Sequence, residues 1–194
     1  KIKLGHKGRV EFLLYVNGKT FHSAFPNKGV NTIHLAGKAI TALENIKFTN
    51  SHEMGDGVLT PTGVVTNSNT SMAPSETAIR FDRRTVPGDT DELVEKEIMD
   101  IVNKIDPNAF SFKIEKSKTI TYTGEEIICE KTFKPWTLDK DHNLTKSLTA
   151  AVKKNDIQIE MGYWGFCTNG VESMGNRQVN TIGFGPGNEE LAHT

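Results

Sequence analysis

Residues 9–18 read RVEFLLYVNG, a run rich in Val, Leu, Phe and Tyr that ends in Asn17-Gly18. Because these residue types favour extended backbone, we expect a strand from Arg9 to Val16. Asn-Gly is the favoured centre of a tight type I′ hairpin turn. The sequence therefore predicts that the chain turns back at once, with Lys19 to His22 as the second strand and His22 at its end.

Outward from this run, two helical patterns alternate with further strands. A helix is expected from about Asn31 to Glu44, with helical spacing of its apolar residues Ile33, Ala36, Ile40 and Leu43. A second helix should open at Asp89-x-x-Glu92, which resembles a capping box, and run to about Ile105. Strands are expected at residues 57–65, 77–84 and 111–116. Together these elements indicate a two-layer α+β sandwich of about 110 residues, large enough for its own core.

The C-terminal part follows a different pattern. Residues 118–135 are mixed in character and are interpreted as a crossover. A helix is expected at 143–155, a strand at 157–161, a loop of small residues at 164–170, and a buried strand at 181–184 before the turn Gly185-Pro186-Gly187. This order is half of an α/β layer, too small to bury both faces of its sheet. The chain as a whole is therefore predicted to be of the α/β class, in two parts.

Composition excludes several classes of protein. The chain has 23 basic and 24 acidic residues and no basic stripe, which argues against nucleic-acid binding. No apolar run approaches the roughly 20 residues that a bilayer requires, and no signal-peptide pattern opens the chain. We expect Cys129 and Cys167 to be free thiols in a reducing cytoplasm. Since the chain starts at Lys1 and stops soon after a glycine-rich turn, we interpret it as a fragment.

Motifs of a self-contained active site are missing. There is no Gly-x-Ser-x-Gly, no Walker loop and no His-Glu-x-x-His, and none of the six histidines pairs with another at metal-ligand spacing. Two histidines stand in better places. His22 follows a strand, where loops carry function; the alternative, which the residues alone favour, is that it caps that strand and bonds its own loop. His193 follows a turn at the end of a buried strand, where α/β sheets place ligands; it is either a zinc ligand or an exposed histidine.

A family resemblance is carried by motifs in a fixed order over nearly the whole chain. They are Gly5-x-Lys7-Gly8-Arg9, Gly18-x-x-x-His22-Ser23-x-x-Pro26-x-x-Gly29-x-Asn31, Phe81-Asp82-Arg83-Arg84, Thr168-Asn169-Gly170, and Gly183-Phe184-Gly185-Pro186-Gly187 with Ala192-His193. In these the sequence resembles the acetylornithine deacetylase and succinyl-diaminopimelate desuccinylase group of zinc peptidases and amidohydrolases. Within that group it is most similar to hydrolases associated with bacterial selenium metabolism.

The resemblance implies a catalytic α/β domain that binds two zinc ions, with a dimerisation or lid domain inserted in it. Residues 5–116 would be the lid, 117–135 a crossover linker, and 136–194 part of the catalytic domain. His193 matches the last metal ligand of the family. His22 matches the lid histidine that reaches the partner subunit's active site and stabilises the oxyanion of the tetrahedral intermediate.

The same resemblance implies substrate contacts. Arg84 matches the lid arginine that holds a substrate carboxylate, for which a bidentate fork is suited. Thr168, Asn169 and Gly170 would line the substrate pocket. The family's lid asparagine falls at Ser71 here, with Asn69 two residues away as the candidate contact. The substrate class implied is a small peptide or an N-acyl amino acid, hydrolysed at an amide bond near a carboxylate.

Other parts of the family's site have no match in this chain. The His-x-Asp ligand pair, the bridging Asp, the Glu-Glu pair and a further acidic ligand all precede the lid in the family. Since one ligand cannot hold two zinc ions, we expect this chain alone to bind zinc weakly and to hydrolyse nothing.

Two functions therefore remain open at this point. The chain is either a fragment of a zinc-dependent amidohydrolase or a non-catalytic dimerisation and binding module; a generic α+β protein is a third reading. Sequence upstream of Lys1 containing His-x-Asp and Glu-Glu would decide for the enzyme. In either case a sandwich with an open sheet edge favours a two-fold homodimer through the lid.

Overall fold

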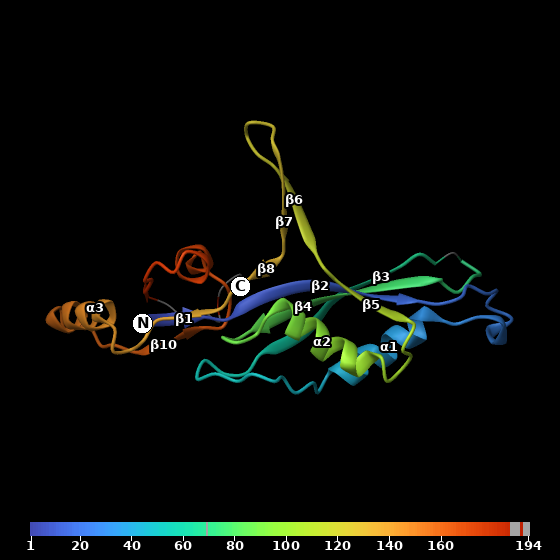
Figure 1. The fold of residues 1–194 in the computed structure, drawn as a ribbon, viewed down its shortest axis with the longest axis horizontal. Coiled ribbons are helices and arrows are strands. Elements are labelled where there is room, and N and C mark those ends of the chain that lie inside the picture. Colours follow the sequence, from blue (N-terminus) through green and yellow to red (C-terminus); the bar gives the residue numbers. More distant parts are fainter. Residues whose placement is uncertain (69, 187–190, 192–194) are drawn as a thin grey trace.

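The computed structural model describes residues 1–68, 70–186 and 191. The molecule is elongated, with two sheets arranged one after the other along its length and a hairpin that stands out from their junction (Figure 1). The larger sheet carries two helices on one face, and the smaller sheet lies beside a third helix. The mixed α and β architecture that the sequence predicts is confirmed.

The larger sheet has the strand order β3-β4-β2-β5, with β8 added to β2. Its strands are β2 (Gly8–Asn17), β3 (Val58–Thr66), β4 (Glu76–Thr85), β5 (Phe110–Ile114) and β8 (Thr132–Phe133). All pairs are antiparallel, and Phe12 of β2 lies opposite Phe81 of β4 at the centre. Side chains alternate between the two faces, so Ile79 and Phe81 are buried under the helices while Arg80 and Asp82 are partly exposed on the other face.

The predicted hairpin at Asn17-Gly18 is wrong. β2 runs in the middle of the sheet, so both of its edges are occupied, by β4 on one side and β5 on the other. No edge is left for a locally returning strand. Instead Lys19 bridges to Val30 and His22 to Met72, and the segment forms irregular loops at the tip of the sheet. Long-range pairing with β4 and β5 overrides the local turn preference of Asn-Gly.

Two amphipathic helices cover one face of this sheet, namely α1 (Thr32–Leu43) and α2 (Asp91–Val102) (Figure 1). α1 begins after Asn31, whose side chain accepts a hydrogen bond from the Ile33 N–H at 2.9 Å. Ile33 is 47% exposed rather than part of the predicted core, because it lies in the first turn and lines an open cavity at the tip. None of the helices in the described ranges is long and apolar enough to span a bilayer.

α2 is capped by Thr90 and not, as predicted, by Asp89. Thr90 Oγ1 accepts the Leu93 N–H at 3.2 Å, and Asp89 turns into the core instead. There its carboxylate pairs with Arg83 at 3.0 Å, and neither side chain is exposed to solvent. The predicted capping box does not form because the Asp89 carboxylate neutralises the buried Arg83, and a buried cation without a counter-charge would cost more free energy than an uncapped helix N-terminus.

Arg83 is the centre of a buried ionic cluster between the sheet and α2. Besides Asp89, the carboxylate of Glu97 on α2 lies 3.7 Å from its guanidinium. The guanidinium also lies over the ring of Phe48, 3.5 Å from the ring centre. Asn50 donates to Asp89 at 3.0 Å, so the long loop between α1 and β3 is bonded to the same cluster. Arg83 therefore joins β4, α2 and this loop in the core.

The smaller sheet has the order β10-β1-β11, with β9 also paired to β1. Its strands are β1 (Ile2–His6), β9 (Trp136–Thr137), β10 (Met161–Trp164) and β11 (Gly183–Phe184). Two other elements belong to this part, helix α3 (Asn143–Lys154) and the π-helix η2 (Val171–Asn176). The strand predicted at 157–161 starts only at Met161, where residues come into register with β1. All five residues of β1 are buried, so this strand is the centre of the sheet.

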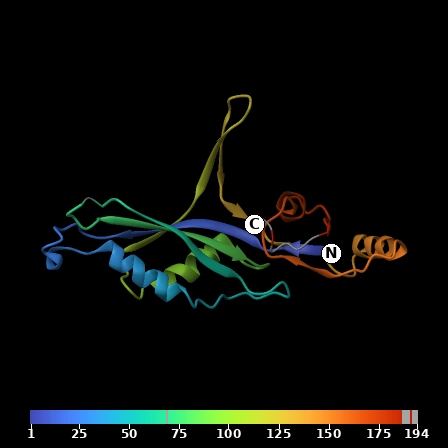
Figure 2. The same cartoon turned by 180° about the vertical axis from the view of Figure 1, so that it is seen from behind.

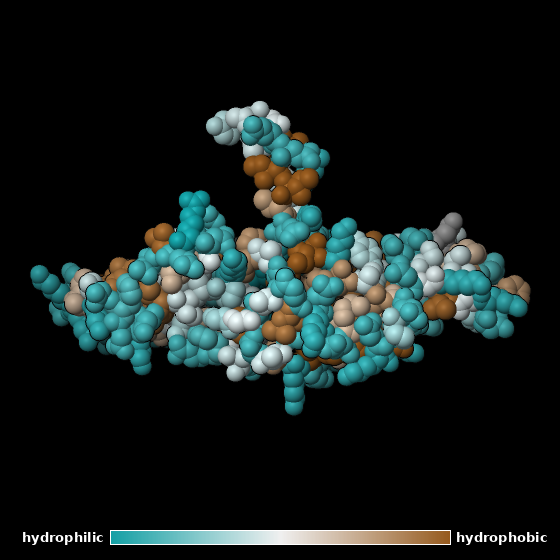
Figure 3. Space-filling view, viewed as in Figure 1, coloured by the Kyte–Doolittle hydropathy of each residue, from teal (hydrophilic) through white to brown (hydrophobic). Residues whose placement is uncertain are grey.

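Residues interpreted as a crossover contain a long hairpin that the sequence did not predict. β6 (Lys116–Ile120) pairs with β7 (Glu126–Glu130), and the hairpin projects away from both sheets (Figures 1 and 2). Apolar residues gather along it on the visible face (Figure 3). Four large side chains are exposed, Ile120, Tyr122, Ile127 and Ile128. β6 has the sequence Lys-Ser-Lys-Thr-Ile, in which only the last residue is apolar, so no apolar pattern predicts the strand.

The loop between α1 and β3 also contacts the smaller sheet. The Tyr163 hydroxyl on β10 donates to the Glu53 carboxylate. The rings of His52 and Tyr163 are nearly perpendicular, with their centres 5.8 Å apart. Burial, together with Glu53, raises the pKa of Tyr163 to about 12, so the phenol stays protonated as the donor. This loop therefore fastens the larger sheet to the smaller one.

Candidate functional site

His22 lies in a tight turn at the tip of the larger sheet. Its carbonyl accepts the Phe25 N–H at 2.8 Å, which closes the turn, and its main chain bridges to Met72. The ring nitrogen Nδ1 accepts the Ala24 N–H at 3.1 Å. The imidazole is exposed and its ring centre lies 6.0 Å from that of Phe25, which is also exposed. The turn thus presents one imidazole and one phenyl ring to the outside.

A cavity of about 750 Å³ adjoins this turn on the side of α1. Its lining is mostly apolar or neutral and comprises Phe21, Ser23, Pro26, Asn31, Ile33, His34, Ser68, Thr70, Met72, Ala73 and Pro74. The candidate Asn69 belongs to the same stretch of sequence but lies outside the described residues. The tip therefore combines an exposed imidazole with an adjacent hollow that could receive part of another molecule.

Arg84 lies at the opposite end of the larger sheet, where β4 meets the second part of the chain. Its guanidinium binds Asp82 through two N–H groups, at 2.8 and 3.0 Å, and Asp82 also accepts from Arg9 at 2.8 Å. The side chain of Arg84 is 25% exposed. A substrate carboxylate at this place would bind to the remaining N–H groups of Arg84.

Cys167 lies beside this arginine pair in the loop after β10. Its thiol donates to the Lys7 carbonyl at 3.3 Å. Burial raises the pKa of the Cys167 thiol to about 11, although the nearby Arg84 and Arg9 act in the opposite direction. The thiol is therefore protonated at neutral pH and is not a nucleophile. Cys167 and Cys129 are both free, as predicted.

The loop at Thr168-Asn169-Gly170 is held by a buried histidine that the sequence reading did not single out. His6 Nδ1 accepts the Thr168 N–H at 2.8 Å and lies 3.0 Å from its hydroxyl. The other ring nitrogen, Nε2, donates to the Lys134 carbonyl at 3.1 Å. Since Nδ1 is an acceptor, His6 is the neutral Nε2–H tautomer. Gly170 packs so closely on Trp136 that an added Cβ would lie 2.6 Å from the indole nitrogen.

These contacts divide the predicted pocket residues into two kinds. Thr168 points inward to His6, and Gly170 is buried against Trp136, so both shape the loop. Asn169 is exposed and is the residue of the three that another molecule can reach. His6 lies between Gly5 and Lys7 of the Gly5-x-Lys7-Gly8-Arg9 motif, which was a signal in the sequence, but only the fold brings it to residue 168.

We expect the stability of the chain to depend on His6 in mildly acidic solution. Burial lowers the pKa of His6 from its ordinary value of 6.5, although the bond to Lys134 partly opposes this. Between the lowered pKa and 6.5 the unfolded chain therefore binds more protons than the folded chain. The free energy of unfolding should be highest above pH 6.5 and fall as the pH drops through this window.

Urea unfolding of the chain at a series of pH values measures this effect, with His6→Asn for comparison. Asn keeps an acceptor for the Thr168 N–H but cannot titrate, so its slope in this window should be shallower. The carboxylates with lowered pKa, such as Glu115, lose their contribution at lower pH, below their ordinary value of 4.5, and do not interfere. If the free energy of unfolding changes equally with pH in the two proteins, the pH dependence does not come from His6.

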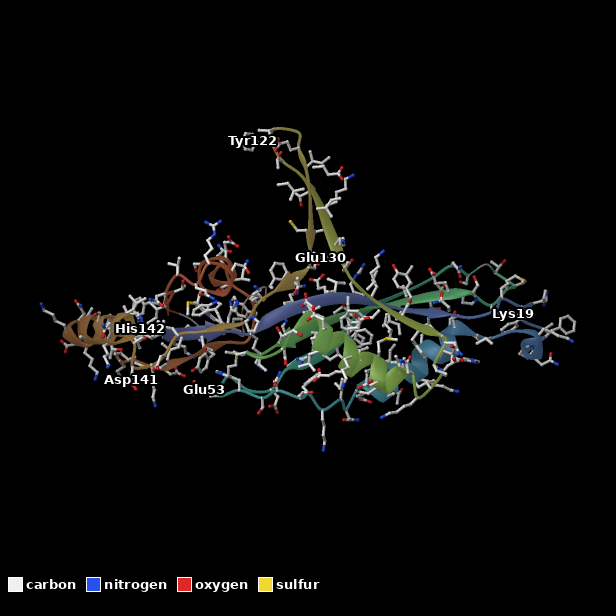
Figure 4. All side chains as sticks on the ribbon, in the orientation of Figure 1. Lys19, Glu53, Tyr122, Glu130, Asp141 and His142 are labelled. Carbon is white, nitrogen blue, oxygen red and sulfur yellow. The ribbon has the colours of Figure 1, made fainter. Side chains whose placement is uncertain are left out.

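The fold brings Arg84 together with the loop at 168–170, but it separates both from His22. The loop follows β10 of the smaller sheet, whereas His22 belongs to the segment at the far tip, which Figure 4 marks by Lys19; His142 at the start of α3 marks the other end. The strand β2 alone, ten residues long, puts roughly 30 Å between the two places. His22 therefore lies far from the smaller sheet of its own chain.

No metal site is formed by the residues that the structure describes. Within these ranges no group of three or more His, Cys, Asp or Glu side chains is placed to hold an ion. The candidate ligand His193 lies outside the described residues. The donor set expected for two zinc ions is thus not met by the described part of this chain.

Comparison with curated proteins finds relatives that are longer than this chain. YgeY of Escherichia coli strain K12 is 29% identical over 195 residues, which cover 97% of this chain and 48% of that protein. The succinyl-diaminopimelate desuccinylase of Helicobacter hepaticus is 28% identical over 133 residues, or 66% of this chain and 33% of the relative. The chain thus spans about half the length, or less, of the curated relatives it matches.

Solved structures show the same fold. A tripeptidase from Staphylococcus aureus superposes with a TM-score of 0.67 at 14% identity, over 93% of this chain and 44% of that one. The aminopeptidase PepT from Bacillus cereus has a TM-score of 0.66 at 14% identity, with the same coverage.

The family is shown by a match to the peptidase dimerisation domain, M20_dimer, over residues 4–109, which is more than half of the chain. The chain belongs to the M20 peptidase family, whose dimerisation domain it contains.

Proposed function

We propose that this chain is the lid and part of the catalytic domain of a metal-dependent amidohydrolase. The full-length protein would hydrolyse an amide bond near a carboxylate in a small peptide or N-acyl amino acid. The family supports a peptidase or hydrolase. Related proteins named as a desuccinylase and as a tripeptidase support substrates of this size and charge.

The observation that carries the proposal is the position of His22. An exposed imidazole at the tip of a long sheet lies far from the smaller sheet of its own chain, so it cannot reach a substrate bound at that sheet of the same chain. In a two-fold dimer the tip of each lid can reach across to the other subunit. We therefore assign His22 as a hydrogen-bond donor to the oxyanion that forms on the substrate bound by the partner subunit.

Substrate binding is assigned to the other end of the lid. Arg84 would hold the substrate carboxylate, and the exposed Asn169, on the loop shaped by Thr168 and Gly170, would contact the substrate beside it. Asn69 is proposed as a further contact from the tip. A carboxylate near Arg84 gains a charge-assisted hydrogen bond in a partly buried place, which favours acidic substrates.

Zinc is proposed as the metal of the full-length protein, with His193 as one ligand. A zinc ion would supply a hydroxide nucleophile at neutral pH and polarise the amide carbonyl. The remaining donors would come from the part of the relatives' length that this chain does not span. This chain by itself is accordingly proposed to bind zinc weakly and to be inactive.

Dimer formation is proposed along strand β3. It stands at the end of the larger sheet and exposes Val58, Val64 and Val65. An open edge with apolar side chains favours pairing with a second copy, and a two-fold axis would use the same strand of both subunits. The bulge between Pro61 and Gly63 restricts continuous pairing to one half of the strand.

Mixed dimers of two inactive full-length variants test the proposal. If His22 acts across the dimer, a subunit with His22→Ala and a subunit with His193→Ala together form one site without either defect. Random mixing should then restore about a quarter of the wild-type activity, because half of the dimers are mixed and each has one intact site. If each variant is inactive alone and mixing restores no activity, His22 does not act in a site shared between the two subunits.

A further inference from the structure

The turn around His22 does more than expose the ring, because it also fixes which ring nitrogen carries the proton. The Ala24 N–H points at Nδ1 from 3.1 Å, so Nδ1 must offer its lone pair. A neutral imidazole has one N–H, which is then on Nε2. The two nitrogens of the ring point in nearly opposite directions, so Nε2–H is directed away from the turn.

Several main-chain bonds hold the Ala24 N–H in this place. The Ser23 N–H donates to the Ser71 carbonyl at 3.0 Å, and the Phe25 N–H donates to the His22 carbonyl at 2.8 Å. On the preceding side the Ala73 N–H donates to the Phe21 carbonyl at 2.9 Å. The residues on both sides of Ala24 are therefore bonded, which leaves its N–H little freedom to turn away from the imidazole.

We propose that the main-chain N–H of Ala24 is a positioning group for His22. It would select the neutral Nε2–H tautomer and hold the ring so that this N–H is ready to donate to an anionic oxygen. The inference rests on the proposed function, in which that oxygen belongs to a substrate in the partner subunit. Preorganisation of a donor matters because a donor that must first reorient loses part of its effect on the transition state.

The exposed Phe25 ring adds an apolar neighbour on the same turn. Its ring is tilted by 55° to the imidazole, and 58% of the residue is exposed in the isolated chain. When the tip is covered by another molecule, this ring displaces water beside the imidazole. A drier surrounding strengthens a hydrogen bond from Nε2–H to an anion.

Nuclear magnetic resonance of this chain tests the tautomer directly, with ¹⁵N-labelled protein at neutral pH. We expect an unprotonated Nδ1 and a protonated Nε2 in His22, and a scalar coupling between the Ala24 amide nitrogen and Nδ1 across the hydrogen bond. His52 and His142 provide internal references, because each accepts the N–H two residues ahead, at 3.2 and 3.1 Å. A protonated Nδ1, or a missing coupling at His22 where the references have one, would overturn the inference.

Kinetics of the full-length enzyme test the consequence. Replacing Ala24 by L-lactic acid exchanges its amide for an ester, which removes the N–H and keeps the methyl side chain. We expect kcat to fall by about ten- to a hundredfold with KM little changed, since the donor remains but is no longer held. An ester variant with wild-type kcat would also overturn the inference.

The two failures can be told apart. If His22→Ala leaves kcat unchanged, the proposed role of His22 fails and the positioning role falls with it. If His22→Ala is inactive while the ester variant is fully active, the role of His22 stands and only the inference about Ala24 is wrong.

Discussion

Replacing Arg83 with alanine is expected to lower the free energy of unfolding of this chain by about 3–5 kcal/mol. The side chains of Arg83 and Asp89 are fully buried, and Glu97 is nearly so, at 9% exposed. Removing the cation leaves two carboxylates in the core without a counter-charge, and it removes the contact with the Phe48 ring. Urea unfolding followed by circular dichroism measures the loss.

Arg80→Ala is the matched control, because it lies on the same strand and also pairs with a carboxylate. Its partner Glu115 is 3.1 Å away, but the Arg80 side chain is 44% exposed. Since water screens an exposed ion pair, this substitution should cost no more than about 1 kcal/mol. A loss for Arg83→Ala as small as that for Arg80→Ala would show that water reaches the cluster.

In the full-length enzyme, His22→Ala is expected to lower kcat by roughly a hundred- to a thousandfold, the effect of removing one oxyanion donor. KM should change much less, because the proposed bond forms on the oxyanion and not on the ground-state amide. The dimer should persist, since His22 is exposed and does not belong to the open edge strand β3. Steady-state kinetics together with sedimentation measure both points.

Two further variants separate the donor from the turn. His22→Asn can still accept the Ala24 N–H through its side-chain oxygen but has no N–H at the position of Nε2, so it should be as inactive as alanine. His22→Gln places an N–H near that position and should recover part of the activity. An active Asn variant would mean that His22 only shapes the turn.

The sequence predicts most elements of the larger sheet but not how they pair. Residues 9–16 are apolar enough to show a strand, and α1 and α2 follow from helical spacing. The hairpin at Asn17-Gly18 was wrong because a local turn signal contains no information about the two distant strands that flank β2. The helix cap predicted at Asp89 was wrong for the same reason, since no local pattern shows that Asp89 pairs with the buried Arg83.

The candidate site residues were chosen from motifs, and the contacts that the fold adds to them could not be predicted in that way. His22, Arg84 and the loop at 168–170 follow from the resemblance, and the structure shows the position of each. The resemblance could not reveal that His6 holds this loop across 162 positions of sequence, because no local pattern links the two segments. Nor could it reveal that Arg84 already binds Asp82.

The central strand β1 has a consequence for synthesis on the ribosome. Residues 2–6 pair with residues 136–137, 161–164 and 183–184, so that even the first of these partner strands, β9, emerges about 130 residues later. At usual translation rates of about 5–20 residues per second that delay is roughly 6–26 s, while the larger sheet already has its strands β2 to β5 and can form. During this time Ile2 and Leu4, both buried in the finished protein, have no partner strand. Strand β1 therefore waits longer for its partners in the nascent chain than the strands of the larger sheet do, and until they emerge it can bind chaperones or aggregate.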